Sequence, residues 1–196
     1  NNVHAIIDDR HTIDRSKCKT CGSCVEACSN NALKISGYEA TLEEVVQEVL
    51  KDKKYYEQSG GGVTISGGEP MYQFEFTKQL LKALKMQGIH TCLDTSGIAA
   101  SEHYIEVAPF VDLFLYDYKI TDLEKHVAYT HVRNEIIKEN LVLLYNLGAQ
   151  IELRCPIIEG INDDEEHFKE IRRLKKLFTD LKGVTIMPYH NVGNSK

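Results

Sequence analysis

The segment VTISGGEP, residues 63 to 70, joins a short β-branched run to a glycine turn and a glutamate. Glycine has no Cβ, so a turn at Gly67 and Gly68 lets the backbone approach a ligand closely. The carboxylate of Glu69 can accept hydrogen bonds from an ammonium group. We therefore predict a strand whose carboxyl end forms part of a binding site. A Gly-Gly-Glu turn is weak support by itself, and its meaning depends on the sequence around it.

The chain around this segment alternates between strand and helix patterns. Residues 41–58 predict an amphipathic helix that begins with a capping box between Thr41 and Glu44. Apolar, β-branched runs typical of strands occur at 63–66, 90–95, 111–118, 149–156 and 184–189. Helical patterns separate these runs at 73–87, 101–108, 133–147 and 163–180. The alternation predicts βαβ units with right-handed crossovers and a parallel sheet covered by helices.

Polar side chains follow each predicted strand at the point where it ends, in the segments SGGEP, DTSG, DYK, RCP and PYHN. In barrels and open α/β sheets alike, the active site is built at that edge of the sheet. Polar loops in general account for asparagine and glycine there, but not for acids, a lysine, an arginine and a histidine at successive strand ends. We predict a site at this edge, in part of a (β/α) barrel or in an open doubly wound sheet.

Four cysteines, Cys18, Cys21, Cys24 and Cys28, follow one another at the spacing of a bacterial ferredoxin motif. Thiolates three residues apart, in a segment that turns at Gly22, can surround a [4Fe–4S] cluster. In two-cluster ferredoxins the fourth cysteine binds the other cluster, so we expect Cys18, Cys21 and Cys24 to share one cluster and Cys28 to bind a second. Zinc is the alternative metal, although structural zinc sites usually use two separated CxxC pairs.

The composition argues against several classes of protein. The net charge is −6 and no basic stripe is present, which argues against a nucleic-acid partner. No apolar run approaches the roughly 20 residues of a membrane span. We therefore predict a cytoplasmic protein with no nucleic-acid or membrane partner. Cys92 and Cys155 lie in strand patterns and are predicted to be small buried hydrophobes, since a disulfide framework suits small secreted domains.

Five segments occur in the order SGGGVTISGGEPMYQ, GIHTCLDTSG, LFLYDYK, ELRCPIIEGIND and MPYH, downstream of the cysteine motif. Together they resemble the glycyl-radical-enzyme activating enzymes, relatives of pyruvate formate-lyase activating enzyme in the radical S-adenosylmethionine (SAM) superfamily. The resemblance covers essentially the whole chain. It implies a partial (β/α) barrel of radical SAM type at residues 39–196, preceded by a small ferredoxin-like Fe–S segment at residues 1–38.

The resemblance also implies roles for the strand ends. The turn at residues 67–69 would bind the amino group of SAM. Asp94, Thr95 and Asp117 would hold a monovalent cation beside the SAM carboxylate. Without the resemblance, Asp94 and Thr95 could simply turn the chain within the DTSG segment.

Three further residues complete the implied cofactor site. Lys119 would bind the SAM carboxylate, His190 would lie against the adenosyl group, and Arg154 would contact SAM or the substrate. Each has a simpler interpretation. Lys119 and Asp117 lie two apart on a strand and could form a surface ion pair, and His190 could be an ordinary loop histidine.

One expected motif is missing. Radical SAM enzymes bind their catalytic cluster with a CxxxCxxC triad, and that spacing does not occur among the six cysteines. We therefore assign no catalytic cluster ligand to this chain. In family members with ferredoxin inserts the triad lies upstream of the insert. Because the chain starts at Asn1 without methionine and stops at Lys196 in a loop-like segment, we expect a fragment, or a degenerate relative, that lacks the triad.

The implied function of the intact protein is that of a radical SAM activase. With [4Fe–4S] clusters and SAM as cofactors, it would generate a 5′-deoxyadenosyl radical that takes a hydrogen atom from a glycine of a partner glycyl radical enzyme. A flavodoxin or a ferredoxin-type protein would donate the electron. Two alternatives stay open. One is an Fe–S electron-transfer module fused to a catalytically silent SAM-binding α/β domain, and the other is a (β/α) enzyme whose cysteines hold zinc.

Overall fold

A computed structural model describes residues 3–35 and 37–189 of the chain. The chain divides into two compact units, Asn1–Ala40 and Thr41–Lys196. Within the described residues, no helix has both the length and the apolar character needed to cross a membrane.

The smaller unit begins with an antiparallel hairpin of β1 (His4–Ile7) and β2 (Arg10–Ile13), followed by η1 (Arg15–Lys17) and α1 (Ser23–Glu26). The hairpin was not expected, because the sequence before residue 37 looks irregular. Its two-residue turn is formed by Asp8 and Asp9, whose φ angles are 49° and 57°. Positive φ at both positions is typical of a type I′ turn, but Asn-Gly or Asp-Gly is its usual sequence signature. The Asp-Asp sequence of this turn therefore does not predict a hairpin.

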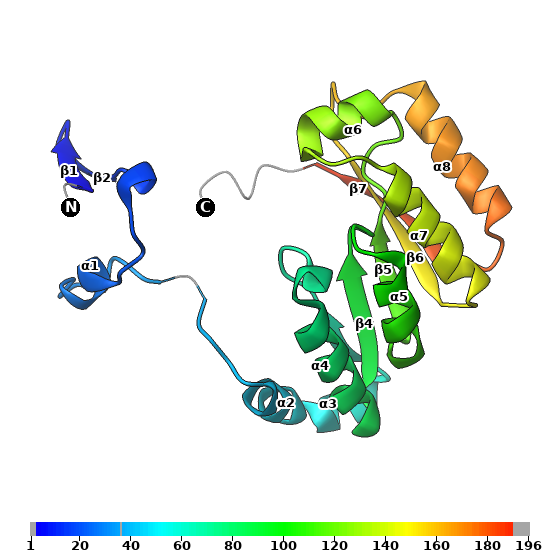
Figure 1. Cartoon of the computed structure of the whole chain (residues 1–196), viewed down its shortest axis with the longest axis horizontal. Coiled ribbons are helices and arrows are strands. Elements are labelled where there is room, and N and C mark those ends of the chain that lie inside the picture. Colours follow the sequence, from blue (N-terminus) through cyan, green and yellow to red (C-terminus); the bar gives the residue numbers. More distant parts are fainter. Residues whose placement is uncertain (1–2, 36, 190–196) are drawn as a thin grey trace. The chain divides into compact units, whose positions relative to one another are not determined.

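The larger unit is built on a parallel sheet whose five strands neighbour one another in the order in which they occur in the chain (Figure 1). The strands are β3 (Gly62–Ile65), β4 (His90–Thr95), β5 (Leu113–Asp117), β6 (Ile151–Ile157) and β7 (Gly183–Pro188). A doubly wound sheet reverses its strand order at a switch point, whereas a barrel does not. Of the two predicted architectures, the consecutive order therefore confirms the partial (β/α) barrel and does not fit the open doubly wound sheet.

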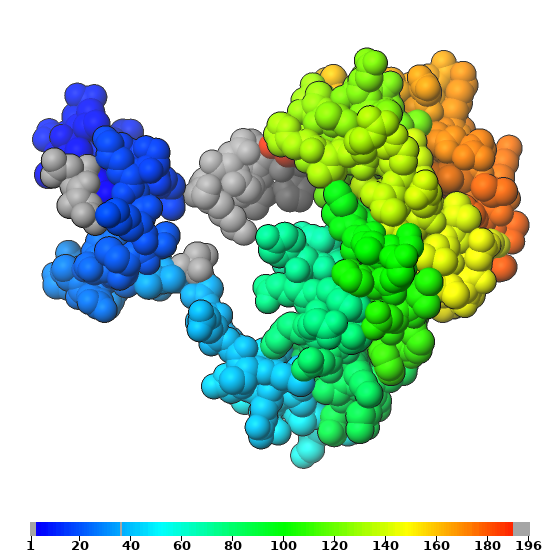
Figure 2. Space-filling model, in the orientation of Figure 1, coloured from blue at the N-terminus to red at the C-terminus, as the bar shows by residue number. Residues whose placement is uncertain are grey.

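Helices cover one face of this sheet (Figure 1). They are α2 (Leu42–Leu50), α3 (Lys53–Ser59), α4 (Phe74–Met86), α5 (Ser101–Val107), α6 (Leu123–Thr130), α7 (Glu135–Asn146) and α8 (Glu165–Leu177), with short 3₁₀ turns at η2 (Pro70–Gln73) and η3 (Ala108–Phe110). The space-filling view shows α5, in green, against α7, in yellow-green (Figure 2). The main core lies between these helices and the sheet and includes Leu81, Leu93, Phe114 and Leu153.

The opposite face of the sheet is polar near the strand ends. Side chains alternate between the two faces of a strand, so the partners of the buried core residues point the other way. On β4, Thr91, Leu93 and Thr95 are buried, while Cys92 and Asp94 are only partly covered. Such a half-covered polar face matches the inward-facing surface of a (β/α) barrel.

Two helical segments differ from the sequence prediction. The helix expected at 41–58 is two helices, because the amides of Lys51 and Asp52 bond three residues back, to Glu48 and Val49, instead of four. The capping box of Thr41 and Glu44 is present as predicted. Helix α6 was not predicted at all. Its N-cap is Asp122, whose side chain accepts a hydrogen bond from the Lys125 amide (2.7 Å), and eight residues give too short a pattern to detect.

Candidate functional site

The Glu69 carboxylate lies at the centre of a dense group of donors beyond the end of β3. Oε1 accepts from the Thr95 hydroxyl at 2.8 Å, and Oε2 accepts from the backbone amide and hydroxyl of Ser96 at 2.8 and 2.6 Å. Oε1 also accepts from the Met71 amide, so Glu69 caps the turn η2. These contacts join the end of β3 to the end of β4. They fix the orientation of the carboxylate that the sequence assigns to SAM.

The Gly67–Gly68 turn beside it is open. A Cβ atom at either glycine would meet nothing within 4 Å, so the backbone is accessible on that side. Gly67 has φ of 142°, in the region that favours glycine. A nearby glycine is constrained in the opposite way: a Cβ on Gly97 would lie 2.0 Å from the Tyr116 hydroxyl oxygen. Gly97 therefore allows the loop after β4 to pass directly over the buried Tyr116 ring.

Asp94 and Thr95 do not point the same way. Thr95 is buried at 2% exposure and its hydroxyl also bonds the Tyr104 hydroxyl, on the helix side of the sheet. Asp94 points to the polar face, where it accepts from the Ser66 hydroxyl at 3.0 Å. Asp94 and Thr95 therefore face opposite sides of the sheet, and their shared role at a cation stays a prediction.

Arg154 joins the two aspartates. Asp117 and Arg154 are register partners on β5 and β6, and the guanidinium donates to the Asp117 carboxylate at 3.0 Å through Nε and 2.8 Å through Nη2. Nη2 also donates to Asp94 Oδ1. All three side chains are about one-fifth exposed, at 22%, 21% and 18% for Arg154, Asp94 and Asp117. A single positive charge therefore compensates two carboxylates at the ends of three neighbouring strands.

Lys119 adds a second positive charge to this group. Its ammonium lies 3.8 Å from the Asp117 carboxylate, and its side chain is 42% exposed. Burial raises the pKa of the Asp117 carboxyl, while the nearby Arg154 guanidinium acts in the opposite direction. The strand ends thus present two cations beside partly covered carboxylates, an arrangement suited to a zwitterionic ligand that carries both an ammonium and a carboxylate.

Of the residues assigned to this site from the sequence, the structure brings Glu69 and Thr95 together in one group and Asp94, Asp117, Lys119 and Arg154 in another. His190 lies outside the described residues. Sequence reasoning missed Ser66 and Ser96, which bond Asp94 and Glu69. Both serines lie in the polar segments SGGEP and DTSG at the strand ends, and this position was the sequence feature that could have identified them.

Sequence reasoning also missed buried asparagines that support these loops. The side-chain amide of Asn140, fully buried on α7, donates to the carbonyls of Gly97 and Ala99 at 2.9 and 2.8 Å. Its Oδ1 accepts from the Ser101 hydroxyl. Asn140 therefore holds the loop that follows β4 and carries Ser96. A buried asparagine on a helix gives no sequence signal for such a role.

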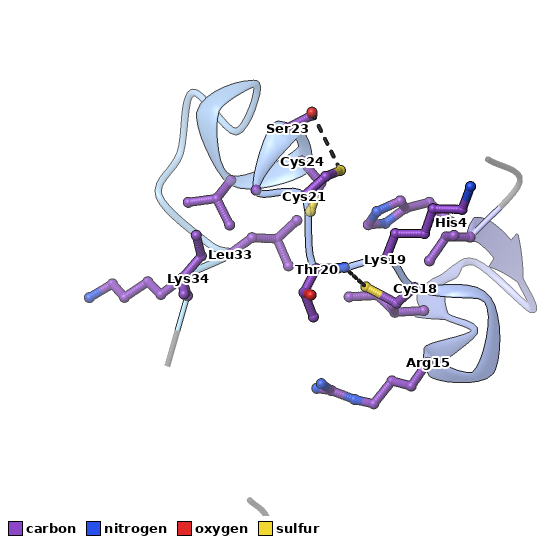
Figure 3. Close-up of a pocket in the computed structure, with 15 residues that line it drawn as sticks. His4, Arg15, Cys18, Lys19, Thr20, Cys21, Ser23, Cys24, Leu33 and Lys34 are labelled. Carbon is purple, nitrogen blue, oxygen red and sulfur yellow. Dashed lines mark hydrogen bonds between the residues drawn. The ribbon is translucent and has the colours of Figure 1, made fainter. Parts of the chain in front are cut away.

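In the smaller unit, three of the four motif cysteines border one cavity of about 680 Å³ (Figure 3). Cys18, Cys21 and Cys24 line it, together with Gly22, and Cys28 is not among its lining residues. The assignment of Cys28 to a second cluster stays a prediction. Gly22 has φ of 79°, and a Cβ there would press on Ile35 at 3.3 Å.

The donors around these thiols fit an iron–sulfur cluster. Backbone amides point at sulfur in two places, from Thr20 to Cys18 (3.4 Å) and from Ala32 to Cys28 (3.3 Å). Backbone amides lower the pKa of the Cys28 thiol, and contacts with Ser23 lower that of Cys21, so both are biased towards the thiolate that binds metal. All four thiols are free. Within the described residues the side chains are not gathered into a closed group of three ligands.

The two cysteines outside the motif differ. Cys155 is completely buried, as predicted, and burial raises its pKa to about 12. Cys92 lies on the polar face and is only partly covered, so the prediction that it is buried holds only in part. Its thiol pKa is also raised, chiefly by burial.

Comparison with known sequence families defines the class of protein. The profile of the Radical SAM superfamily matches residues 26–174, and that of the 4Fe-4S binding domain matches residues 11–34. The chain therefore belongs to the radical SAM superfamily and carries an N-terminal [4Fe–4S] motif. The second match favours iron–sulfur over zinc for the cysteines, as the spacing predicted.

Its relatives within the superfamily are activating enzymes of glycyl radical enzymes. The chain is 44% identical over 171 residues to the trans-4-hydroxy-L-proline dehydratase activating enzyme of Clostridioides difficile, covering 85% of this chain and 56% of that protein. It is 38% identical over 170 residues to the choline trimethylamine-lyase activating enzyme of Oleidesulfovibrio alaskensis, covering 85% of this chain and 55% of that protein. The chain thus spans about half the length of these curated relatives.

A solved structure supports the same relationship. The crystal structure of a domain of pyruvate-formate lyase-activating enzyme from Bacteroides vulgatus superposes with a TM-score of 0.62 at 36% identity. The match covers 67% of this chain and 82% of that domain. The predicted resemblance and fold class are both confirmed by these comparisons.

Proposed function

We propose that the protein to which this chain belongs is a radical SAM activase that installs a glycyl radical on a partner enzyme. The observation that carries this proposal is the charge arrangement at the ends of β3 to β6. The Glu69 carboxylate, held by four hydrogen bonds, gives the end of β3 a fixed negative charge that attracts an ammonium group, and Lys119 offers an ammonium to a carboxylate. SAM carries both groups on its methionyl part. The chain's activating-enzyme relatives, at 44% and 38% identity, support the same reaction.

In this proposal the chain binds and orients SAM, and the cofactors carry out the radical chemistry. SAM, together with a reduced [4Fe–4S] cluster, supplies the 5′-deoxyadenosyl radical. Asp94, Asp117 and Arg154 set the charge around the SAM carboxylate, with a monovalent cation as a further component beside the two aspartates. His190 is proposed for the adenosyl side, as the resemblance implies.

The N-terminal unit is proposed to carry electrons to the site. Three cations, Arg15, Lys19 and Lys34, border the cysteine cavity, and none of the described residues that line it is acidic (Figure 3). A positive rim attracts an acidic partner and speeds its encounter. A flavodoxin or a ferredoxin-type protein is therefore our proposed electron donor, and the cytoplasm our proposed compartment.

The test uses the full protein with its clusters reconstituted without oxygen. With SAM and a chemical reductant we expect 5′-deoxyadenosine, and we expect Lys119→Ala to lower SAM affinity by about tenfold, the loss of one charged contact. Lys182→Ala, an exposed lysine just before β7, serves as the matched control. Tight SAM binding without any 5′-deoxyadenosine would favour the alternative, an electron-transfer module fused to a silent SAM-binding domain.

A further inference from the structure

The hydrogen-bond ladder between β5 and β6 stops beside Lys119, and a proline is the reason. The amide of Tyr118 donates to the Arg154 carbonyl at 2.8 Å, which continues the register that pairs Asp117 with Arg154. In a parallel ladder, the N–H of a residue donates to one carbonyl of the neighbouring strand. Its C=O then accepts from the N–H two residues further along that same strand. The Tyr118 carbonyl therefore faces residue 156, which is proline and has no N–H to donate.

The side chain of Asn162 bonds backbone groups on both segments near the point where the ladder ends. Its Nδ2 donates to the carbonyl of Lys119 at 2.6 Å and to the carbonyl of Pro156 at 2.7 Å. Its Oδ1 accepts from the Ile158 amide at 2.7 Å. Asn162 is only 2% exposed, and both its donors and its acceptor are used. One buried amide thus ties Lys119, two residues beyond β5, to the end of β6.

The segment that follows Lys119 is held in the same way. Asn134, also 2% exposed, donates from Nδ2 to the carbonyls of Ile120 and Thr121 at 3.1 and 3.0 Å. Three successive carbonyls, from residue 119 to residue 121, are therefore bound by buried asparagine side chains. Among them, the bond to Lys119 is made by Asn162.

Fixing the backbone matters more for a lysine than for most residues. Its side chain is long and flexible, so the position of the Cα atom determines which points in space the ammonium can reach. The Lys119 side chain is 42% exposed and its backbone carbonyl is held by a buried group. Support of this kind from a buried neighbour is what a precisely placed binding residue requires.

We propose that Asn162 is a positioning residue for Lys119, which it keeps within reach of the carboxylate of SAM. This inference rests on the proposed function, because that function places Lys119 at the SAM carboxylate. Asn162 touches no ligand in this proposal. It acts through the backbone carbonyl of Lys119, to which its side chain donates.

The test compares two ligands, SAM and decarboxylated SAM, on the full reconstituted protein under anaerobic calorimetry. In Asn162→Ala we expect the affinity for SAM to fall about tenfold, within the range measured for coupled neighbouring residues. We expect the affinity for decarboxylated SAM to stay unchanged, since that ligand has no carboxylate for Lys119 to bind. Lys119→Ala should show the same selectivity, and the double variant should bind SAM no more weakly than Lys119→Ala alone.

Thr91→Val is the matched control. It also removes a buried side-chain bond to a backbone carbonyl, that of Phe110 at 2.7 Å, but Thr91 lies at the opposite end of the sheet. We expect it to lower the unfolding midpoint while both affinities stay unchanged. If Asn162→Ala does not fold, Asn162→Ser, which keeps one donor, replaces it. Its affinities for SAM and decarboxylated SAM are then compared in the same way.

Two results separate failure of this inference from failure of the proposed function. Equal weakening of both ligands in Asn162→Ala, or losses that add in the double variant, would show that Asn162 does not act through Lys119. Wild-type protein that binds neither ligand would instead contradict the proposed function and, with it, the premise of this inference.

Discussion

Arg154 determines the charge balance at the strand ends, because its guanidinium is shared by Asp94 and Asp117. In Arg154→Gln the two partly covered carboxylates lose their common partner, so we expect the free energy of unfolding at pH 7 to fall by about 2–3 kcal/mol. The measurement is denaturant unfolding of the protein without SAM.

The same variant has a predictable pH dependence. Burial already raises the pKa of Asp117, and removal of the guanidinium, which lowers it, raises that pKa further. The variant loses stability because a charged Asp117 carboxylate is unfavourable in its folded state. This loss is present above the raised pKa of Asp117 and disappears as the pH falls through that pKa and the carboxylate is protonated. We therefore expect wild type and variant to converge towards pH 4. A constant difference from pH 7 to pH 4 would contradict this account of the cluster.

The sequence predicts only in part which residues at the strand ends share a site. Asp94, Asp117 and Arg154 follow from the rule that parallel strand ends meet at one edge. The resemblance grouped Asp94 with Thr95, although adjacent strand residues point to opposite faces of a sheet, as these two do in the structure. The role of Asn162 does not follow from sequence, because its bonds to Lys119 and Pro156 depend on the path of a loop that no periodicity describes.

Among the connections between helices and strands, the loop after β4 has a strict steric requirement at Gly97. Gly97 has φ of 81°, and a Cβ there would lie 2.0 Å from the hydroxyl oxygen of the fully buried Tyr116. That hydroxyl donates to the Ile137 carbonyl, so the ring cannot move without breaking a buried bond. We expect Gly97→Ala to lower the free energy of unfolding by more than about 3 kcal/mol, through overpacking and strain.

Gly88→Ala is the matched control for this prediction. Gly88 has φ of 71°, but a Cβ there would meet nothing within 4 Å. We expect it to cost only the backbone penalty, about 1–2 kcal/mol. Equal losses in the two variants, measured by chemical unfolding, would show that contact with Tyr116 is not what requires glycine at position 97.

Element prediction succeeded where patterns were long and failed where they were short. The five strands were predicted within two residues of their observed ends, because apolar runs between helices are distinctive. The hairpin of β1 and β2 and the eight-residue helix α6 were missed. The division of the first long helix near Lys51 was missed as well, since the amphipathic pattern continues across it.

For the molecule as a whole, the two units differ in what stabilises them. The larger unit has an extended apolar core, whereas Val3 is the one buried side chain among residues 3–35 and 37–40. A segment of this size with so little core usually depends on metal or disulfides, and its cysteines are free. The iron–sulfur clusters are therefore the expected source of stability for the smaller unit.

Removal of the clusters should unfold the smaller unit selectively. After treatment with an iron chelator, we expect amides of residues 3–35 to lose protection against hydrogen exchange, while amides in β4, β5 and β6 keep theirs. Hydrogen exchange followed by mass spectrometry measures both in one sample, so the larger unit is the internal control. Unchanged protection of residues 3–35 would show that this unit folds without metal.

The proposed activity is tested most directly by electron paramagnetic resonance on a partner enzyme. The full protein, reconstituted and reduced without oxygen, is incubated with SAM and a panel of glycyl radical enzymes, beginning with trans-4-hydroxy-L-proline dehydratase. We predict a glycyl radical signal on at least one partner, with 5′-deoxyadenosine formed in step with it. Protein that binds its clusters and SAM but gives neither the radical nor 5′-deoxyadenosine with any partner would contradict the proposal that this is an activase.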